Sequence, residues 1–285
     1  EQRLVGNGVW VKSFLKIAKN NQWILLSATP ADSWMDLIPL FIANGFYKNR
    51  SEFLRRHVVY SRFSKFPKVE RYLEVSRLIA LKDSILINMH FKRNTTSNYI
   101  NVICNFDKDK ERQLIIERWN IYEQEPVRDV SQLCYLLRKL VNSDADRLNK
   151  LNEIWARHKK IVIFYNFNYE LEILRKFSHD NNISFSEWNG HKHEPIMQTD
   201  SWIYLVQYTS GAEGWNCTQT DTIIFYSQNY SYRIMTQAAG RIDRLDTKYI
   251  DLYYYKFISN SVIDLSIDKA LKNKQTFNEH RFMRI

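Results

Sequence analysis

Two arginines near the carboxyl end of the chain have the chemistry to stabilise a developing negative charge. Arg241 and Arg244 lie in the string QAAGRIDR, which begins at Gln237. Their spacing of three residues predicts that, on a helix, both guanidinium groups project from one face as a cationic pair. Arginine is suited to holding a transferring phosphoryl group, because its planar group offers several donors and stays charged. The alternative is a surface helix whose arginines pair with Asp243 or Asp246.

A second candidate site is the loop TSGAEGWN, residues 209–216, which follows the strand-like run IYLVQY at residues 203–208. In a parallel sheet the carboxyl ends of the strands face the ligand crevice. Hydroxyl groups and glycines just after a strand allow backbone amides to approach phosphate oxygens closely. The loop therefore indicates phosphate binding, and the alternative is a tight turn that merely needs its glycines.

His191, Lys192, His193 and Glu194 raise the question of a metal site. His191 and His193 are two positions apart, so on a strand their side chains would face the same side, as metal ligands must. No third ligand lies at a convincing spacing, so a solvated loop is favoured and no metal is predicted.

The positive charge of the chain is concentrated between residues 48 and 82. This stretch holds ten Lys or Arg and three Glu, a net +7 of the chain's +10. Aromatic residues are interleaved with these charges: Tyr47, Phe53, Tyr60, Phe63, Phe66 and Tyr72. Cations beside stacking rings favour a nucleic-acid backbone, because each neutralised phosphate releases a counterion. We therefore predict nucleic-acid contacts at Arg55 and Arg56; the alternative is a solvated helical face whose aromatic side chains point into a core.

Composition excludes several classes of protein. The 285 residues are 45% hydrophobic and 25% charged, a globular balance unlike that of disordered, collagen-like or coiled-coil chains. No apolar run approaches the ~18 residues of a membrane span, and the first residues lack a signal peptide's apolar core. Three widely spaced cysteines are predicted to be buried small side chains rather than disulfide partners, which fits a cytoplasmic protein: Cys104, Cys134 and Cys217.

The elements that would position the candidate residues alternate in the last part of the chain. Helices lie between several strand-like runs there, which is typical of a parallel sheet covered by helices. The expected strands are 161–165, 203–208, 222–226 and 250–257. Asn168 and Ser261 are expected to cap helices, the latter in a capping box with Asp264.

The rest of the chain is less regular. Residues 10–20 are expected to form a helix that leads into a buried strand at 23–26, and residues 84–91 and 98–106 alternate as strands that could pair. Helical spacing returns at 108–122 and 129–156.

Together these strings resemble the motifs of superfamily 2 helicases and translocases, the DEAD/DEAH-type and Swi/Snf-like proteins. QAAGRIDR matches motif VI, LLSATP at residues 25–30 matches motif III, and TSGAEGWN followed by TDTIIFY resembles motif V and its next strand. IVIFYNF at residues 161–167 lies where motif IV would. The long helical stretch before it is similar to the Swi/Snf-like branch. The resemblance covers nearly the whole chain and is strongest from residue 161 to 247.

The resemblance implies an α/β fold and a division into three parts. Residues 1–45 would end a first RecA-like lobe, residues 46–150 would form a mostly helical basic elaboration, and residues 151–285 would form a complete second RecA-like lobe. It also implies ATP and Mg²⁺ as cofactors, DNA or alternatively RNA as a partner, and no membrane.

Residue by residue, the resemblance implies arginine fingers at Arg241 and Arg244, with Gln237 on the nucleotide side of the cleft. In motif V, Thr209 and Ser210 would contact the nucleic-acid backbone. The positions implied to lie toward the nucleotide are Glu213, Gly214, Asn216 and Gly240, and those implied to couple hydrolysis to lobe movement are Ser27 and Thr29.

The chain departs from the family in one respect. It contains no Gly-Lys and no Asp-Glu dipeptide, so it lacks the phosphate-cradling loop and the acidic motif for Mg²⁺ and the attacking water. In relatives both lie upstream of SATP. We therefore expect an upstream lobe to be missing and the chain alone to bind nucleic acid without turning over ATP. The alternatives are a non-hydrolysing nucleic-acid-binding module and the motor fragment of a restriction system.

Overall fold

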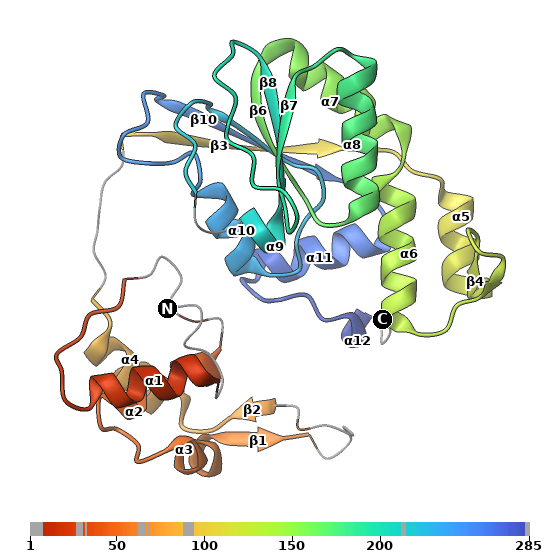
Figure 1. Cartoon of the computed structure of the whole chain (residues 1–285). Coiled ribbons are helices and arrows are strands. Elements are labelled where there is room, and N and C mark those ends of the chain that lie inside the picture. Colours follow the sequence, from red (N-terminus) through yellow and green to blue (C-terminus); the bar gives the residue numbers. More distant parts are fainter. Residues whose placement is uncertain are drawn as a thin grey trace. The chain divides into compact units, whose positions relative to one another are not determined.

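The computed structural model describes residues 8–26, 31, 33–61, 67, 69–87, 94–211 and 215–282, without the side chains of residues 280 and 281 (Figure 1). The chain divides into two compact units, Glu1–Lys92 and Arg93–Ile285. The sequence placed boundaries at 45 and 150 instead. The difference arises because residues 96–103 form a strand that joins the sheet of the second unit.

The second unit is built on a six-stranded sheet in which every pair of neighbouring strands is parallel. In sheet order the strands are β3 (Thr96–Ile103), β10 (Asp251–Ile258), β9 (Thr222–Phe225), β6 (Lys160–Tyr165), β8 (Trp202–Gln207) and β7 (Phe185–Trp188). The four strands predicted after residue 160 are confirmed. Their near-continuous apolar runs reflect burial of both faces of the sheet.

Alternate side chains of each strand enter two different cores. On β6, Ile161 and Ile163 pack with α7 (Ala145–Arg157) and α8 (Asn168–Asp180). Val162 and Phe164 point to the other face and pack with α10 (Tyr232–Ala239). The helices therefore cover both faces, as the predicted α/β class requires.

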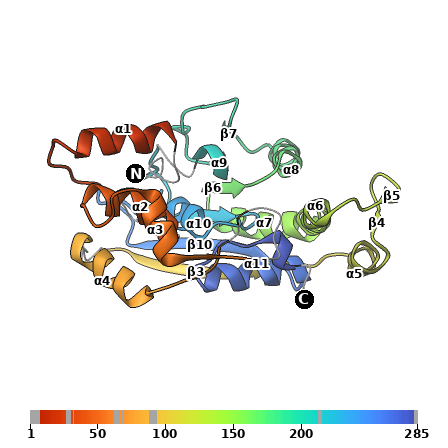
Figure 2. The same cartoon turned by 90° about the horizontal axis from the view of Figure 1, so that it is seen from below.

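A third core joins the helices beside the sheet. Leucines of α6 (Val130–Asn142) pack against Ile263 and Ile267 of α11 (Val262–Lys272) and against Leu114 in the π-helical turn η2 (Gln113–Glu117). In both views α5 (Lys108–Arg112) lies next to α6 (Figure 2). The strands β4 (Trp119–Asn120) and β5 (Glu125–Pro126) follow, and α12 (Glu279–Phe282) ends the described chain.

The first unit is a small helical body with one hairpin. Its elements are α1 (Val9–Ala18), α2 (Trp34–Ala43), α3 (Arg50–His57), β1 (Val58–Tyr60), β2 (Val69–Tyr72) and α4 (Val75–Ile85). Tyr47 and Phe53 are buried in its core beside Phe41. His57 is also buried; its Nε2 lies 2.7 Å from the Tyr47 hydroxyl and its Nδ1 3.2 Å from the Leu73 carbonyl oxygen.

Two strand predictions in this part of the chain are wrong. Residues 23–26 are not a strand, and Ile24 and Leu26 are 84% and 80% exposed. A strand needs a neighbour for its backbone groups, and the described residues place none beside this run. The predicted strand 84–91 is wrong over its described residues, because residues 84 and 85 end α4; residues 88–91 lie outside the described part of the chain. The strand predicted at 98–106 does form, as β3, but it pairs in parallel with β10 and not with residues 84–91.

The predictions of helix starts have mixed outcomes. Ser261 does cap α11, since its side chain accepts a hydrogen bond from the Asp264 amide. The Asp264 carboxylate does not complete the capping box, because it accepts hydrogen bonds from the Ser259 amide and hydroxyl instead. Asn168 is the first residue of α8 rather than its cap, and the Glu170 carboxylate accepts the hydrogen bonds of the preceding amides.

The three cysteines are free and buried, as predicted. Burial raises the pKa of the Cys104 thiol to about 11 and that of Cys134 to about 12, and it also raises the pKa of Cys217. They therefore stay protonated at neutral pH and act as small apolar side chains. Across the described ranges, no helix is both long and apolar enough to cross a membrane.

Candidate functional site

The carboxyl ends of three neighbouring strands are tied together by one asparagine. Asn166, directly after β6, donates from its side-chain nitrogen to Ser227 Oγ at 2.8 Å. Its side-chain oxygen accepts from Asn229 Nδ2 at 2.8 Å, and its backbone carbonyl accepts from Gln207 Nε2 at 3.4 Å. These contacts define the edge of the sheet at which ligands bind in parallel α/β folds.

The first candidate loop begins at this edge as the short helix α9 (Tyr208–Gly211). Thr209 is exposed, and the Ser210 carbonyl accepts a hydrogen bond from Trp188 Nε1 at 3.0 Å. Gly211 is required by packing, because a Cβ there would lie 2.0 Å from Val206 Cγ1. The glycine thus allows the loop to lie directly against the end of β8.

The second candidate loop does not have the predicted geometry. Helix α10 contains Gln237, half-buried, but ends at Ala239, so Arg241 and Arg244 are not on a helical face. Gly240 ends the helix, and the chain then turns with the Arg241 amide bonded to the Ala238 carbonyl at 3.2 Å. The expected cationic fork on one helix is therefore wrong: both arginines lie in the turn that follows.

Arg241 joins the two candidate loops. Its Nη1 donates to the Trp215 carbonyl at 2.8 Å, and its own carbonyl accepts from the Cys217 amide at 2.9 Å. Asn216, between these two partners, is exposed. Two residues that are 26 positions apart in the sequence are thus in direct contact.

Arg244 carries an unused hydrogen-bond donor. Its Nε is buried and has no hydrogen-bond partner among the described residues. A buried hydrogen-bond donor without a partner lowers the stability of the fold. Such a donor is explained if it binds an anion when the protein functions. The neighbouring Asp243 accepts a hydrogen bond from Thr95 Oγ1 at 2.9 Å, which ties this turn to the start of β3.

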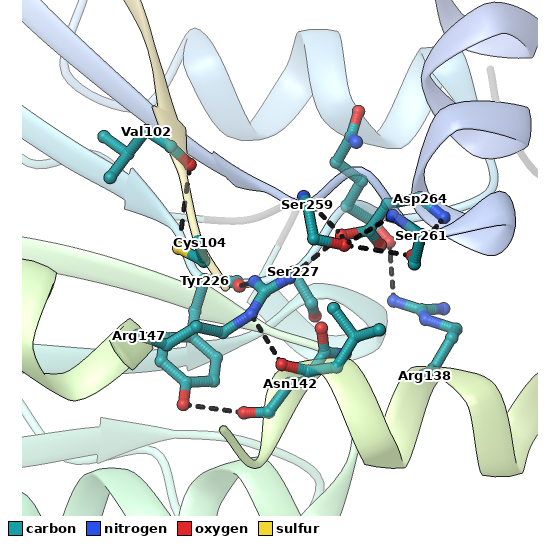
Figure 3. A network of polar contacts seen from close by, with 12 residues as sticks. Val102, Cys104, Arg138, Asn142, Arg147, Tyr226, Ser227, Ser259, Ser261 and Asp264 are labelled. Carbon is teal, nitrogen blue, oxygen red and sulfur yellow. Dashed lines mark hydrogen bonds and ion pairs between the residues drawn. The ribbon is translucent and has the colours of Figure 1, made fainter. Parts of the chain in front are cut away.

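Sequence reasoning missed a buried polar frame behind the sheet edge (Figure 3). Arg138 of α6 donates to the Gln228 carbonyl at 2.7 Å, and Arg147 of α7 donates to the Tyr226 carbonyl. Arg147 is fully buried and also forms an ion pair with Asp264 of α11 at 3.0 Å. Two guanidinium groups therefore hold the segment between β9 and α10.

A buried carboxylate completes this frame. Glu170 is fully buried and accepts hydrogen bonds from Ser227 Oγ at 2.9 Å, from Asn142 Nδ2 at 2.8 Å and from the Asn166 amide at 2.7 Å. Such a set of donors allows a carboxylate to remain inside a protein. The frame thus links helices α6, α7 and α8 to the segment that precedes α10.

Four of the predicted site residues lie outside the described part of the chain, and two lie in the first unit. Those outside are Ser27, Thr29, Glu213 and Gly214. Arg55 and Arg56 are both exposed on α3, where Arg56 pairs with Glu52 at 3.3 Å.

Two aromatic residues of the basic stretch are not available for stacking on a nucleic acid. Tyr47 and Phe53 are in the core of the first unit, so for them the alternative of a core-directed aromatic is correct. Tyr60 is 36% exposed, and Phe63 and Phe66 lie outside the described residues.

Among the described residues, no three His, Cys, Asp or Glu side chains lie close enough together to bind a metal ion. His191 and His193 lie in an exposed turn after β7.

This six-stranded parallel sheet flanked by helices, with the two candidate loops joined at its carboxyl edge, has the fold of a carboxyl-terminal RecA-like lobe. The resemblance seen in the motifs is confirmed by relatives. The chain is 24% identical over 232 residues to the human lymphoid-specific helicase, covering 75% of this chain and 26% of that protein. It is 24% identical over 152 residues to the chromatin-remodeling ATPase INO80 of Eremothecium gossypii, covering 48% of this chain and 10% of that protein.

A solved structure agrees on the fold. The C-terminal part of the Fun30 ATPase domain matches with a TM-score of 0.53 at 14% identity, over 65% of this chain and 92% of that one. No protein-family model matches the sequence. The chain spans about a quarter or less of the length of these curated relatives, which are named as a helicase and as ATPases.

Proposed function

We propose that this chain is the second lobe of an ATP-dependent helicase or translocase that moves along nucleic acid. The observation that carries the proposal is the junction at Arg241. One residue of the motif VI turn holds the backbone of motif V through two hydrogen bonds, at 2.8 and 2.9 Å. A pure binding module has no need for arginines held at this position.

The residues of the turn fit a phosphate group. The buried Nε of Arg244 has no partner among the described residues, and a phosphate oxygen would supply one. In the proposal Arg241 and Arg244 stabilise charge on the transferring phosphoryl group, and Gln237 contacts the nucleotide beside them. ATP bound between two lobes supplies the phosphoryl group.

Mg²⁺ does not fit the described residues, since they contain no cluster of metal ligands. The sequence also lacks a Gly-Lys and an Asp-Glu dipeptide. We therefore propose that another lobe supplies the phosphate-cradling loop and the metal ligands. For the isolated chain, the same absence supports the second candidate function, a lobe that binds nucleic acid without hydrolysing ATP.

ATP hydrolysis by the purified chain tests the proposal of a second lobe. We expect no turnover with or without single- or double-stranded DNA, and turnover when a lobe carrying the two missing motifs is added. Arg241→Ala should abolish this restored hydrolysis and leave nucleic-acid affinity nearly unchanged. Equal loss of both would contradict the finger assignment, and DNA-stimulated hydrolysis by the chain alone would contradict the missing-lobe proposal.

Nucleic-acid contacts are proposed at Thr209 and Ser210, and at Arg55, for which the described residues show no ion pair. Arg55→Gln should weaken DNA binding and lower the slope of log K against log salt by about 0.9 on duplex DNA. Lys12→Gln is a matched control, because Lys12 is exposed on α1 in the same unit but outside the basic stretch. Equal slopes for both variants would favour the solvated-face alternative.

A further inference from the structure

The turn after β7 is built around a buried asparagine. Asn189 is 4% exposed. Its amide donates to the Lys192 carbonyl at 2.8 Å, and its side-chain oxygen accepts from the amides of His191 and Lys192 at 2.9 and 3.0 Å. Its side-chain nitrogen donates to Glu187 Oε2 at 3.1 Å. The asparagine therefore fixes the backbone of residues 189–192 from within.

This turn lies against the motif V loop. The indole of Trp188, the last residue of β7, donates to the Ser210 carbonyl at 3.0 Å and packs on the His193 ring at 4.6 Å between centroids. A Cβ added at Gly190 would lie 3.9 Å from Ser210 Oγ, and one added at Gly211 would lie 3.4 Å from Trp188 Cδ1. The turn and α9 thus share one surface.

The turn presents basic side chains to solvent. His191, Lys192 and His193 are all exposed. The Lys192 ammonium lies 3.5 Å from Glu194 Oε1 and 3.8 Å from Glu187 Oε2, which are long contacts for ion pairs.

The charge of Glu187 is largely neutralised by another partner. Arg175 of α8 donates to both oxygens of its carboxylate at 2.7 Å. Lys192 is therefore not needed as the counterion of Glu187, and Glu194 is its remaining acidic neighbour. An exposed ammonium with such weak pairing is free to exchange its partner for a stronger anion.

We propose that the turn of residues 189–193 binds the phosphate backbone of the nucleic acid that contacts motif V. Lys192 supplies the charge, the imidazole N–H groups of His191 and His193 supply hydrogen-bond donors, and Asn189 and Trp188 hold them in place. The inference rests on the proposed function, because it extends the contact surface of Thr209 and Ser210. The ligand proposed for the His-Lys-His string is therefore a phosphate group rather than a metal ion.

Fluorescence anisotropy with labelled single- and double-stranded DNA tests this inference. The whole chain is titrated at several salt concentrations from about 50 to 200 mM, the range over which phosphate contacts dominate the salt dependence. Lys192→Gln should raise the dissociation constant several-fold at the lowest salt. It should also lower the salt slope by about 0.9 on duplex DNA or about 0.7 on single strands. Adding His191→Gln should weaken binding further.

Lys150→Gln is the matched control, because Lys150 also pairs with a glutamate, Glu153 at 3.0 Å, but lies on α7 on the other face of the sheet. Equal binding by the Lys192→Gln and Lys150→Gln chains, with tight binding by the unsubstituted chain, would refute this inference alone. Absence of DNA binding by the unsubstituted chain would refute the proposed function as well. Binding that is lost on adding a chelator would overturn the inference in favour of a bridging metal.

Discussion

Replacing the buried Arg147 by methionine should destabilise the second unit strongly. Its side chain is fully buried and donates to the Val141 carbonyl at 3.1 Å, to the Tyr226 carbonyl and to Asp264 at 3.0 Å. Breaking a buried ion pair costs ~3–5 kcal/mol, because the remaining charge stays inside without a counterion. Asp264 keeps two hydrogen bonds from Ser259, at 2.9 and 2.8 Å, which favours the lower end of that range.

Urea unfolding measures this loss. A loss of about 3 kcal/mol, at a slope of ~2 kcal/mol per M, lowers the midpoint by about 1.5 M. Arg157→Met, on the exposed side of the same helix, is the control and should change stability by less than ~0.5 kcal/mol. Adding Asp264→Asn to Arg147→Met should cost less than the sum of the single changes, because it removes the unpaired charge. A loss below about 1 kcal/mol, or strict additivity, would refute the account of a buried ion pair.

Two further predictions concern the surroundings of motif V. Gly211→Ala should destabilise the fold by ~1–3 kcal/mol, because the new Cβ would overlap the buried Val206. Gly190→Ala is the control in the same unit, because its new Cβ would lie 3.9 Å from the nearest atom, and equal urea midpoints for the two variants would contradict the packing argument. For Glu187, burial raises the pKa, but the hydrogen bonds and charge of Arg175 lower it more, so that the net pKa lies below its ordinary value. The carboxylate therefore stabilises the fold above its unfolded pKa, and this contribution is lost as the pH falls through the lower folded pKa. Glu187→Gln should flatten the acid-side fall of the unfolding free energy, and a curve parallel to that of the unsubstituted chain would be evidence against the pair.

The sheet was predictable because its strands are buried on both faces. Four apolar runs after residue 160 show this directly, and each became a strand within about one residue of the expected bounds. β3 was identified as a strand but not as a member of this sheet. Its partner β10 lies about 150 residues further on, and alternation within β3 carries no information about so distant a neighbour.

The arrangement of the candidate site was harder to predict. The spacing of Arg241 and Arg244 indicates a helix, but the helix ends at Ala239: Gly240 follows it, and the Arg241 amide bonds to the Ala238 carbonyl rather than to that of Gln237. The buried arginines did leave a signal. Arg147 is in helical register with the buried Leu151, so a charge occupies the apolar face of its helix, which requires a buried partner.

Trp215 connects the two kinds of contact proposed for this lobe. Its carbonyl accepts from Arg241, and its indole N–H donates to the Gly211 carbonyl at 2.6 Å. Gly211 ends the helix that carries Thr209 and Ser210, so two hydrogen bonds in sequence connect the motif VI turn to the end of this helix. The other end of α10 is fixed separately, since Asn229 bonds to Asn166 at the end of β6. Hydrogen bonds therefore hold both ends of α10 to other parts of the lobe, and the bond at its carboxyl end is the one that involves the proposed arginine finger.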